Sequence, residues 1–541
     1  MECSATDLGE DSSSLRVSGE RLIQRESVGL LRERRCIQDA GRYDYVLLSD
    51  VHLGSDLVTH LRPWAATSWL TREAEVDDKL VSLLAYHRAR RQGRPLCVVM
   101  AGDFLDLVGV SLPPDKARTT PTPEERKHGL GSAPDHVVQK MWAIARRHPR
   151  VFKAMAELIA EGNQLVLVRG NHDIELYWYA AQHAFVEAVL EHLPMHQHAE
   201  LAPRIAIHSW FFAVPGVLYV EHGHQFDPMC SYGDPLSSTC PIDSRRIRSV
   251  PFSVMLRNVA RPTRGLSTSA YEHASFGAYL GLMVRLGLRG CARIAVRFAR
   301  AASKLVGTWV SHVQGEGCRR RHAAGMRKSR FAERQGVTGE QLAGLESLYV
   351  RPASHSLAFV LCSLYLDRVA AVAAALAFTV LGATLARNES TLEGIVCALP
   401  ALLFAAYAVF GIDRDIFPTR KMQSGATRIA QLFDARWVVM GHTHEPMDHA
   451  LAEGDGEAPR YVNLGHWGED DLPEERQVDA TTSCTYLHVR MEGGRYRGDL
   501  MRWDSQLGPR KAVLGAAAPA EDRDLEDRPQ GKAPRGLLGA A

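Results

Sequence analysis

Five short motifs rich in Asp, Asn and His occur in a fixed order along this chain. They are Asp50-Val51-His52, Gly102-Asp103-Phe104-Leu105-Asp106, Gly170-Asn171-His172-Asp173, His222-Gly223-His224 and Gly441-His442-Thr443-His444. Their side chains offer carboxylate oxygens, an amide oxygen and imidazole nitrogens, and none offers a thiolate. This donor set suits Mn²⁺, Fe, Zn²⁺ or Mg²⁺ more than a cysteine-rich structural zinc site. The motifs therefore predict metal-ion chemistry.

Each motif follows an apolar run that is typical of a buried strand. These runs cover residues 45–48, 96–100, 164–168, 217–220 and 437–440. Sheet enzymes place their sites beyond the carboxyl ends of strands, so we expect the five motifs to meet at one edge. A single motif of this kind is more often a surface turn with hydrogen-bonded histidines than a site. Five of them, in order and each after a strand, favour a site.

This ordered pattern resembles the calcineurin-like metallophosphoesterase superfamily, whose signature is D-x-H, G-D-x-x-D, G-N-H-D/E, a lone His and G-H-x-H. The resemblance covers residues 44–225 and 435 to about 505. It implies an α/β fold, a four-layer α/β/β/α sandwich, with a dinuclear metal centre. It also implies hydrolysis of a phosphoester or pyrophosphate bond by metal-activated water.

The resemblance also implies how the motifs would hold two divalent ions, with manganese expected first and iron, zinc or magnesium as alternatives. One ion is expected on Asp50, His52, Asp103 and His444, and the other on Asp103, Asn171, His222 and His442. Asp103 would then bridge them. Two cations about 3.5–4 Å apart can bind a phosphoryl group and a water-derived nucleophile between them.

His172 is the catalytic residue that the resemblance implies, and it would protonate the leaving oxygen or stabilise charge on the transferred group. The pKa of a histidine lies near the working pH, and we expect the neighbouring Asp173 to orient the ring. The alternative is a purely structural hydrogen bond. For Asp106, a supporting role is expected rather than metal ligation.

Two further residues are expected to contact the substrate. His224 lies two residues after His222 and shares its face if the strand continues; we assign the metal to His222 and leave His224 as a substrate contact. Arg169, just before the third motif, is positioned to hold a phosphate oxygen. The competing interpretation of Arg169 is a surface ion pair.

Charge is distributed unevenly along the 541 residues, although the formal net charge is only +2. Residues 243–351 contain 20 Lys and Arg against six Asp and Glu, so this block is strongly basic and the remainder is acidic. A basic block calls for an anionic neighbour, either a membrane surface or nucleic acid. Nucleic acid is not expected, because the block lacks interleaved aromatic residues and adjoins apolar segments.

The region between His224 and His442 contains three candidate membrane elements. Residues 279–310 predict a helix with Arg285, Arg289, Arg293, Arg297, Arg300 and Lys304 on one face and Met283, Ile294, Phe298, Leu305 and Trp309 on the other. Such a helix either lies in an anionic membrane interface or packs its apolar face on the enzyme. Residues 369–386 and 394–412 are free of charge and just long enough to cross a bilayer. We expect a transmembrane hairpin, with a buried helical hairpin as the alternative.

The flanking charges predict the orientation of this hairpin. Arg368 precedes it and Arg414, Arg420 and Lys421 follow it, so the positive-inside rule keeps both flanks, and the catalytic domain, in the cytoplasm. Ten scattered cysteines without a paired spacing are typical of reduced thiols, and the polar N-terminus does not resemble a signal peptide.

The expected organisation has five parts. They are a flexible segment over 1–40, the first part of the phosphoesterase domain over 41–225, a basic helical insertion over 226–434, the second part over 435–505, and a flexible tail over 510–541. A strand hairpin through Gly493 and Gly494 is expected to close the second part.

Three functions remain open from the sequence. The first is a membrane-bound hydrolase of a phosphorylated lipid precursor, because the Asp-x-His-Leu and Gly-His-Thr-His-x-Pro motifs and the insertion position resemble UDP-2,3-diacylglucosamine hydrolases. The second is a nucleotide phosphodiesterase or a phosphoprotein phosphatase that is merely anchored to membrane lipids. The third is a non-catalytic membrane scaffold, ranked last because every expected ligand is present.

Overall fold

The structure is a computed structural model that describes residues 38, 41–57, 66–91, 93–240, 242–263, 276–313, 316–356, 366–388, 391–410, 418–452, 458–467, 483–512 and 514. The two segments expected to be flexible, 1–40 and 510–541, lie almost entirely outside these residues. The expected tail begins too early, since the chain continues as a strand to Lys511.

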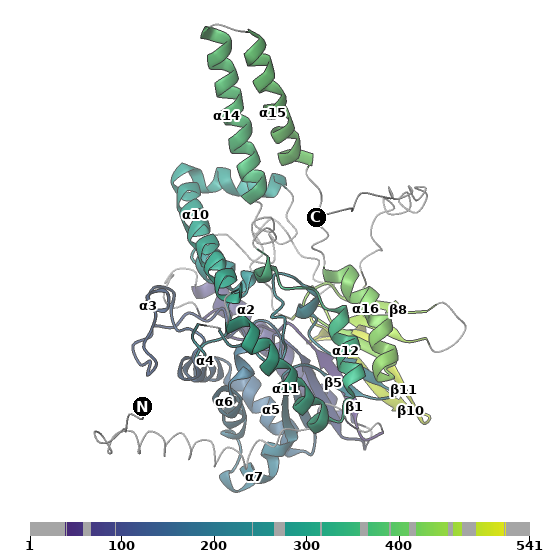
Figure 1. Cartoon of the computed structure of the whole chain (residues 1–541). Coiled ribbons are helices and arrows are strands. Elements are labelled where there is room, and N and C mark those ends of the chain that lie inside the picture. Colours follow the sequence, from purple (N-terminus) through teal and green to yellow (C-terminus); the bar gives the residue numbers. More distant parts are fainter. Residues whose placement is uncertain are drawn as a thin grey trace, which may run out of the picture.

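Two mixed sheets form the centre of the molecule (Figure 1). The larger has the order β12-β11-β10-β1-β2-β3-β4, with β1 Asp44–Leu48, β2 Leu96–Ala101, β3 Gln164–Val168, β4 Ile205–His208, β10 Thr485–Glu492, β11 Arg495–Asp504 and β12 Gly508–Lys511. The smaller has the order β5-β6-β7-β9-β8, with β5 Phe212–Val214, β6 Leu218–Val220, β7 Trp437–Met440, β8 Met447–Ala450 and β9 Arg460–Asn463. Strands β1 to β4 run parallel, which confirms that successive motifs leave the larger sheet at one edge.

Alternation along the strands places the hydrophobic core on both faces of the larger sheet. In β1, Val46 and Leu48 face one cluster while Tyr45 and Leu47 face another, as the period of two along a strand requires. The first cluster is completed by α2 Ala66–Ala89, α4 Pro134–Arg147, α5 Pro149–Ala160 and α6 Tyr179–Leu190. The second cluster is shared by strands of both sheets, so the sheets pack against each other.

A third cluster covers the other face of the smaller sheet. It includes Leu342 and Leu345 of α12 Gly339–Leu348 and Met422, Ile429 and Phe433 of α16 Pro418–Phe433. Both helices belong to the stretch that we expected to be a separate insertion. Because they bury apolar side chains on the sheet, α12 and α16 are part of the body that contains the two sheets.

Residues 221–436, the excursion, connect two neighbouring strands of the smaller sheet. Strand β6 pairs in parallel with β7 although about 200 residues separate them, with Leu218 opposite Trp437 and Val220 opposite Val439. The last motif is thereby placed beside the fourth. Strands β10 and β11 form the expected closing hairpin, and Gly493 and Gly494 take the positive φ values that its two-residue turn requires.

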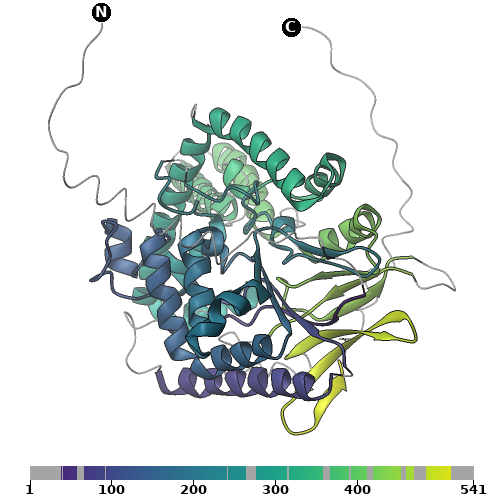
Figure 2. The ribbon, with the colours of Figure 1, turned by 90° about the horizontal axis from the view of Figure 1, so that it is seen from below.

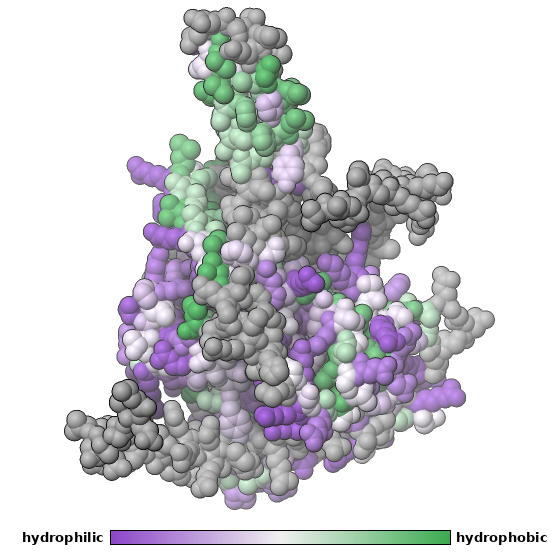
Figure 3. Space-filling model, viewed as in Figure 1, coloured by the Kyte–Doolittle hydropathy of each residue, from purple (hydrophilic) through white to green (hydrophobic). Residues whose placement is uncertain are grey.

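Helices α14 Leu366–Asn388 and α15 Thr391–Phe410 stand side by side and project away from the body (Figure 1). Their surface is mostly apolar (Figure 3), and Phe378 stacks on Phe404 with ring centroids 5.9 Å apart. Among the described helices, one stretch is long and apolar enough to cross a membrane, Ala370–Arg387, and only 11% of it is buried. Val396–Tyr407 is a shorter apolar stretch, and residues 411–412 of the expected second span lie outside the description.

The basic amphipathic helix is present as α10 Phe276–Val313, with a kink at Gly287, where φ is 60°. Its second half packs on the body, because Ala301 and Leu305 are fully buried against α8 Pro251–Met255 and the adjoining turn η5 Leu256–Ala260. Phe298 lies in the same contact. The second half of α10 is therefore packed on the body, which was the alternative to a helix lying in the membrane interface. Leu288, near the kink, is 92% exposed. The view from below shows the helices that cover the sheets (Figure 2).

Candidate metal centre

Backbone strain is concentrated in the five motifs. Seven non-glycine residues of the described chain have positive φ, and five of them are expected metal ligands: Asp50, His52, Asp103, His442 and His444. Each residue held in this region costs on the order of 1–3 kcal/mol, so the surrounding structure must enforce it. Such strain at five chemically related residues indicates a functional site.

The loops after the strands are held together by close backbone contacts. Asp50 N donates to Gly102 O at 3.2 Å, and His52 N donates to Asp103 O at 2.9 Å. Two motif glycines permit the approach, because a Cβ on Gly170 would fall on the Asp103 carboxylate and one on Gly441 would fall on that of Asp50. The glycines in these motifs are therefore required by packing around the two aspartates.

Three imidazoles converge on one buried carboxylate oxygen. Asp50 Oδ1 lies 3.2 Å from His444 Nε2, 3.9 Å from His52 Nε2 and 4.0 Å from His222 Nε2. The other oxygen of Asp50 accepts a hydrogen bond from His442 N at 3.0 Å. Asp50, His52 and His444 come from the first and last motifs, so the structure brings together chain segments almost 400 residues apart.

The second group is centred on His222. Its Nε2 lies 3.1 Å from Asp103 Oδ2 and 3.0 Å from Asn171 Oδ1, while its Nδ1 donates to the Ala101 carbonyl at 3.0 Å. When Nδ1 donates its proton to this carbonyl, the Nε2 lone pair is available to bind a metal ion. This arrangement is common in metal-ligating histidines. Asp103 Oδ1 accepts from His172 N at 2.8 Å, which joins the third motif to the second.

Electrostatics at the centre favour a bound cation. Burial opposes ionisation of Asp50, yet the charges of His222 and His444 outweigh it and lower its pKa to about 2. Burial likewise opposes protonation of His222, but Asp103 and Asp50 raise its pKa to about 9. Two buried carboxylates thus attract positive charge to this site.

The residues present fit divalent metal ions. Asp50, His52 and His444 form one group whose ligand atoms lie within 4.8 Å of one another, and Asp50, Asp103 and His222 form another. The two groups share Asp50, and Asp103 also belongs to a third group with His52 and His172. Carboxylate oxygens and imidazole nitrogens in this number suit borderline divalent ions. Buried His and Asp groups able to hold a metal ion are therefore present.

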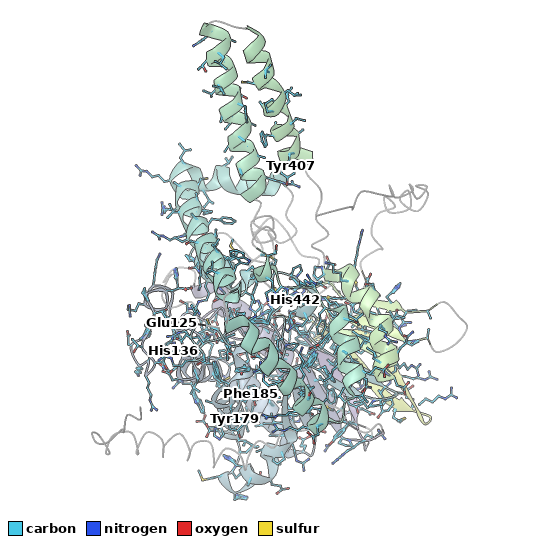
Figure 4. All side chains as sticks on the ribbon, viewed as in Figure 1. Glu125, His136, Tyr179, Phe185, Tyr407 and His442 are labelled. Atoms are coloured by element: carbon cyan, nitrogen blue, oxygen red, sulfur yellow. The ribbon has the colours of Figure 1, made fainter. Side chains whose placement is uncertain are left out.

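His442 is engaged differently from the other expected ligands. Its Nε2 lies 3.0 Å from Asp227 Oδ2, and its ring centroid lies 5.2 Å from that of His222. Asp227 and Cys230 form a further group with it whose atoms lie close enough to hold an ion. His442 is therefore engaged by Asp227 through Nε2, and its place as a metal ligand beside His222 stays a prediction. Figure 4 labels His442 within the body of the molecule.

His172 is oriented by Asp106, and the expectation that Asp173 would orient it is wrong. Asp106 Oδ1 lies 2.7 Å from His172 Nδ1, whereas Asp173 accepts hydrogen bonds from the backbone N–H groups of Gly170 and Phe104 at 2.6 and 3.0 Å. Asp173 is buried, and its backbone bonds hold two motif loops together. Burial and the nearby Asp103 charge raise the pKa of Asp173 to about 7.

The expected contact of Arg169 with a phosphate oxygen stays a prediction, and Nη1 of this residue has no hydrogen-bond partner among the described residues. Its side chain is buried and donates from Nη2 to the carbonyl oxygens of Ser209 and Pro235. These bonds tie the end of β3 to the start of the long excursion.

His224 is also buried, and its ring lies 5.5 Å from that of His222. Burial, followed by the charges of His222 and His442, holds the pKa of His224 well below its usual value. Its substrate contact stays a prediction.

Three site residues outside the five motifs were missed, all of them between the fourth and fifth motifs. Asp227 contacts His442, Phe252 places its ring 4.9 Å from that of His172, and Arg261 Nη2 donates to Asp106 Oδ2. Arg261 also donates to the Ser55 carbonyl at 2.9 Å. Of these three, only Asp227 could have been suspected from the sequence, because it is a carboxylate five residues after His222.

Neither a comparison with protein-family models nor one with curated proteins finds a match for this chain.

Proposed function

We propose that this chain is a dinuclear metal-dependent phosphoesterase of the calcineurin-like type. The observation that carries the proposal is the convergence of His444, His52 and His222 on Asp50 Oδ1 in a strained, buried pocket. In this proposal Asp50, His52, Asp103 and His444 hold one ion, and Asp103, Asn171, His222 and His442 hold the other. Bound divalent ions would supply positive charge to a phosphoryl group and make water acidic enough to attack it near neutral pH.

His172 is the proposed general acid for the leaving group. Asp106 accepts from Nδ1 and would stabilise the imidazolium, and in this role Nε2 would carry the transferable proton. Arg261 in turn holds the other oxygen of Asp106. The His172 side chain is 13% exposed, so it lies at the surface of the pocket where a substrate oxygen can reach it.

The order of packing supports the proposal that the body is a four-layer α/β/β/α sandwich. One core cluster joins helices α2, α4, α5 and α6 to the larger sheet, a second is shared by both sheets, and a third joins the smaller sheet to α12 and α16. This order leaves the strand ends of both sheets side by side. The five motifs would then meet over that junction.

A lipid-linked phosphate or pyrophosphate is the substrate class we favour, for example a UDP-diacylglucosamine-like precursor. Two observations support it. Helices α14 and α15 expose large apolar side chains, including Leu376 at 62% and Leu402 at 67%, which a membrane would cover. The excursion that carries them also provides Phe252 beside His172. In this proposal the hairpin anchors the protein and the catalytic domain faces the cytoplasm.

Phosphorus NMR tests the function directly. Purified full-length protein in detergent would be incubated with UDP-2,3-diacylglucosamine and Mn²⁺, with a chelator control and an Asn171→Ala variant. We expect cleavage to UMP and the lipid monophosphate by wild type only, and loss of cleavage with chelator. No cleavage by a preparation that hydrolyses a simple aryl phosphodiester would reject the lipid substrate and favour a nucleotide or phosphoprotein substrate. No hydrolysis of either compound would reject the phosphoesterase.

A further inference from the structure

A cationic cavity lies between α10 and neighbouring segments of the body, and none of its lining residues belongs to the five motifs. It has a volume of about 450 Å³ and is formed between α10, α3 Pro123–His128 and the turn at Pro262. Four of its eight lining residues are cations: Lys127, Arg293, Arg297 and Arg300. None of the eight is a carboxylate.

The positive charges of this cavity are poorly balanced by the described protein. Glu124 lies nearby, but it is already hydrogen-bonded to Lys304 Nζ and to Asn258. Arg297 donates from Nη1 to the neutral hydroxyl of Thr263 at 2.9 Å, and burial followed by repulsion from Arg293 lowers its pKa. Clustered guanidinium groups that face no carboxylate are the usual receptor for a phosphate group.

One side of the cavity is apolar and continues beyond it. Ala292 and Val296 line it together with Arg300, and these residues form an i, i+4 ridge that starts at Leu288. Val296 is 50% exposed and Leu288 is 92% exposed. From Leu288 to Arg300 the ridge extends about 18 Å along the helix. A free phosphate ion would make no use of this surface, whereas an acyl chain would cover it.

We propose that this cavity binds the phosphate headgroup of an anionic phospholipid, with an acyl chain laid along the Leu288–Val296 ridge. The position of α10 relative to α14 and α15 supports a lipid as the ligand. In Figure 1 the kinked end of α10 points toward the end of the body from which α14 and α15 project, and Figure 3 shows apolar surface on both. The kinked end of α10 would therefore lie near the lipid surface that the hairpin would reach.

The binding site is also connected to the catalytic residues. Arg297 contacts Thr263, and two residues earlier Arg261 holds Asp106, the partner of His172. Pro262 lies between them and lines the cavity. A bound headgroup would therefore hold in place the short segment that positions the catalytic pair.

Binding of short-chain lipids to the full chain in neutral detergent tests this inference without relying on turnover. Dioctanoyl-phosphatidylglycerol, dioctanoyl-phosphatidylcholine and inorganic phosphate would be titrated separately by calorimetry. The test variant is the double substitution Arg293→Gln and Arg300→Gln, which leaves the Arg297–Thr263 bond intact. The matched control is Arg289→Gln with Arg330→Gln, because both are exposed arginines outside the cavity and the charge change is the same.

We expect phosphatidylglycerol to bind wild type at least tenfold more tightly than the other two probes. The test variant should bind it about tenfold more weakly, since each lost charge-assisted bond removes a fraction of the affinity, and the control should stay within twofold of wild type. Equal binding of inorganic phosphate would overturn the lipid assignment. No binding by wild type, an unaffected test variant, or an equal loss in the control would overturn the site. None of these outcomes depends on whether the protein is a phosphoesterase.

Discussion

His172 Nδ1 lies 2.7 Å from Asp106 Oδ1, although 66 positions separate the two residues in the chain. The contact crosses from the third motif to the second, and the buried carboxylate is held from its other side by Arg261. Burial opposes ionisation of Asp106, but the charges of His172 and Arg261 outweigh it, so its pKa lies well below the usual range. Asp106 is therefore ionised beside His172 near neutral pH.

Replacing Asp106 with Asn should lower kcat about 100-fold with little change in KM, because general acid catalysis contributes factors of about 10²–10⁴. Loss of the carboxylate also lowers the pKa of His172, so the alkaline limb of the pH–rate profile should move to lower pH. Steady-state kinetics of an aryl phosphodiester from pH 5 to 9 would measure both. An unchanged profile, or the same shift in Asp173→Asn, would contradict the assignment of Asp106.

Arg261→Gln should reduce kcat about tenfold, because the excursion would no longer fix the second oxygen of Asp106. The effect should be in kcat more than in KM, since Arg261 acts through Asp106. Arg261→Lys retains the charge and should recover part of the loss. A variant that raises KM at constant kcat would instead show that Arg261 contacts the substrate.

The motif residues could be predicted from the sequence because each follows a run of buried apolar residues, and strand order then fixes where they meet. Asp50 and His444 were assigned to one ion, and their side chains do lie together. The partner of His172 could not be predicted in the same way. Asp173 is adjacent in sequence, but its carboxylate is drawn to the N–H groups of Gly170 and Phe104, which the strained loops leave without other acceptors.

Membrane association should depend on the apolar surface of α14. Val380, which is 63% exposed, lies near the middle of the candidate span, and Val380→Arg should weaken insertion by about 3 kcal/mol. Removing residues 357–417 should release the protein from carbonate-washed membranes while keeping α16 in the core. Leu507→Arg is the matched control, since Leu507 is equally exposed and lies outside the two projecting helices. Carbonate-resistant association of the deletion variant would reject the hairpin as an anchor.

Stability in acid should depend on Glu125, which joins α3 to the excursion. Burial opposes its ionisation, but Arg246 and the Thr122 N–H outweigh this and lower its pKa to about 2. Figure 4 labels it close to His136. Because the folded pKa lies below the usual 4.5, the carboxylate stabilises the fold fully above pH 4.5, and this is lost as pH falls toward 2.

Protonation of Glu125 should therefore decrease the free energy of unfolding by about 1–3 kcal/mol between pH 5 and 2.5. Glu125→Gln retains the capping bond to Thr122 but cannot titrate, so its stability should change less over the same range. Urea unfolding followed by tryptophan fluorescence would compare the two proteins. Parallel curves would show that Glu125 contributes nothing to the acid response.

The excursion was the least predictable part of the chain. Spacing predicted a basic and an apolar face on its long helix, but spacing cannot say what a face will meet. Leu305 is buried against the body and Leu288 is exposed, although both follow the kink of the same helix, because the contact of α10 with α8 and η5 lies around Ala301 and Leu305. The same limit applies to Arg261, whose role depends on a turn that brings it to Asp106.

The number of divalent ions bound per chain tests the central claim most directly. Purified full-length protein, stripped with a chelator and reloaded with Mn²⁺, would be measured by elemental analysis beside Asp103→Asn and the control Asp504→Asn, an aspartate of the closing hairpin. We predict two ions per chain in wild type and control, and fewer than one in Asp103→Asn because it removes the bridging carboxylate. No bound ion in wild type, or two ions retained in Asp103→Asn, would contradict the dinuclear centre.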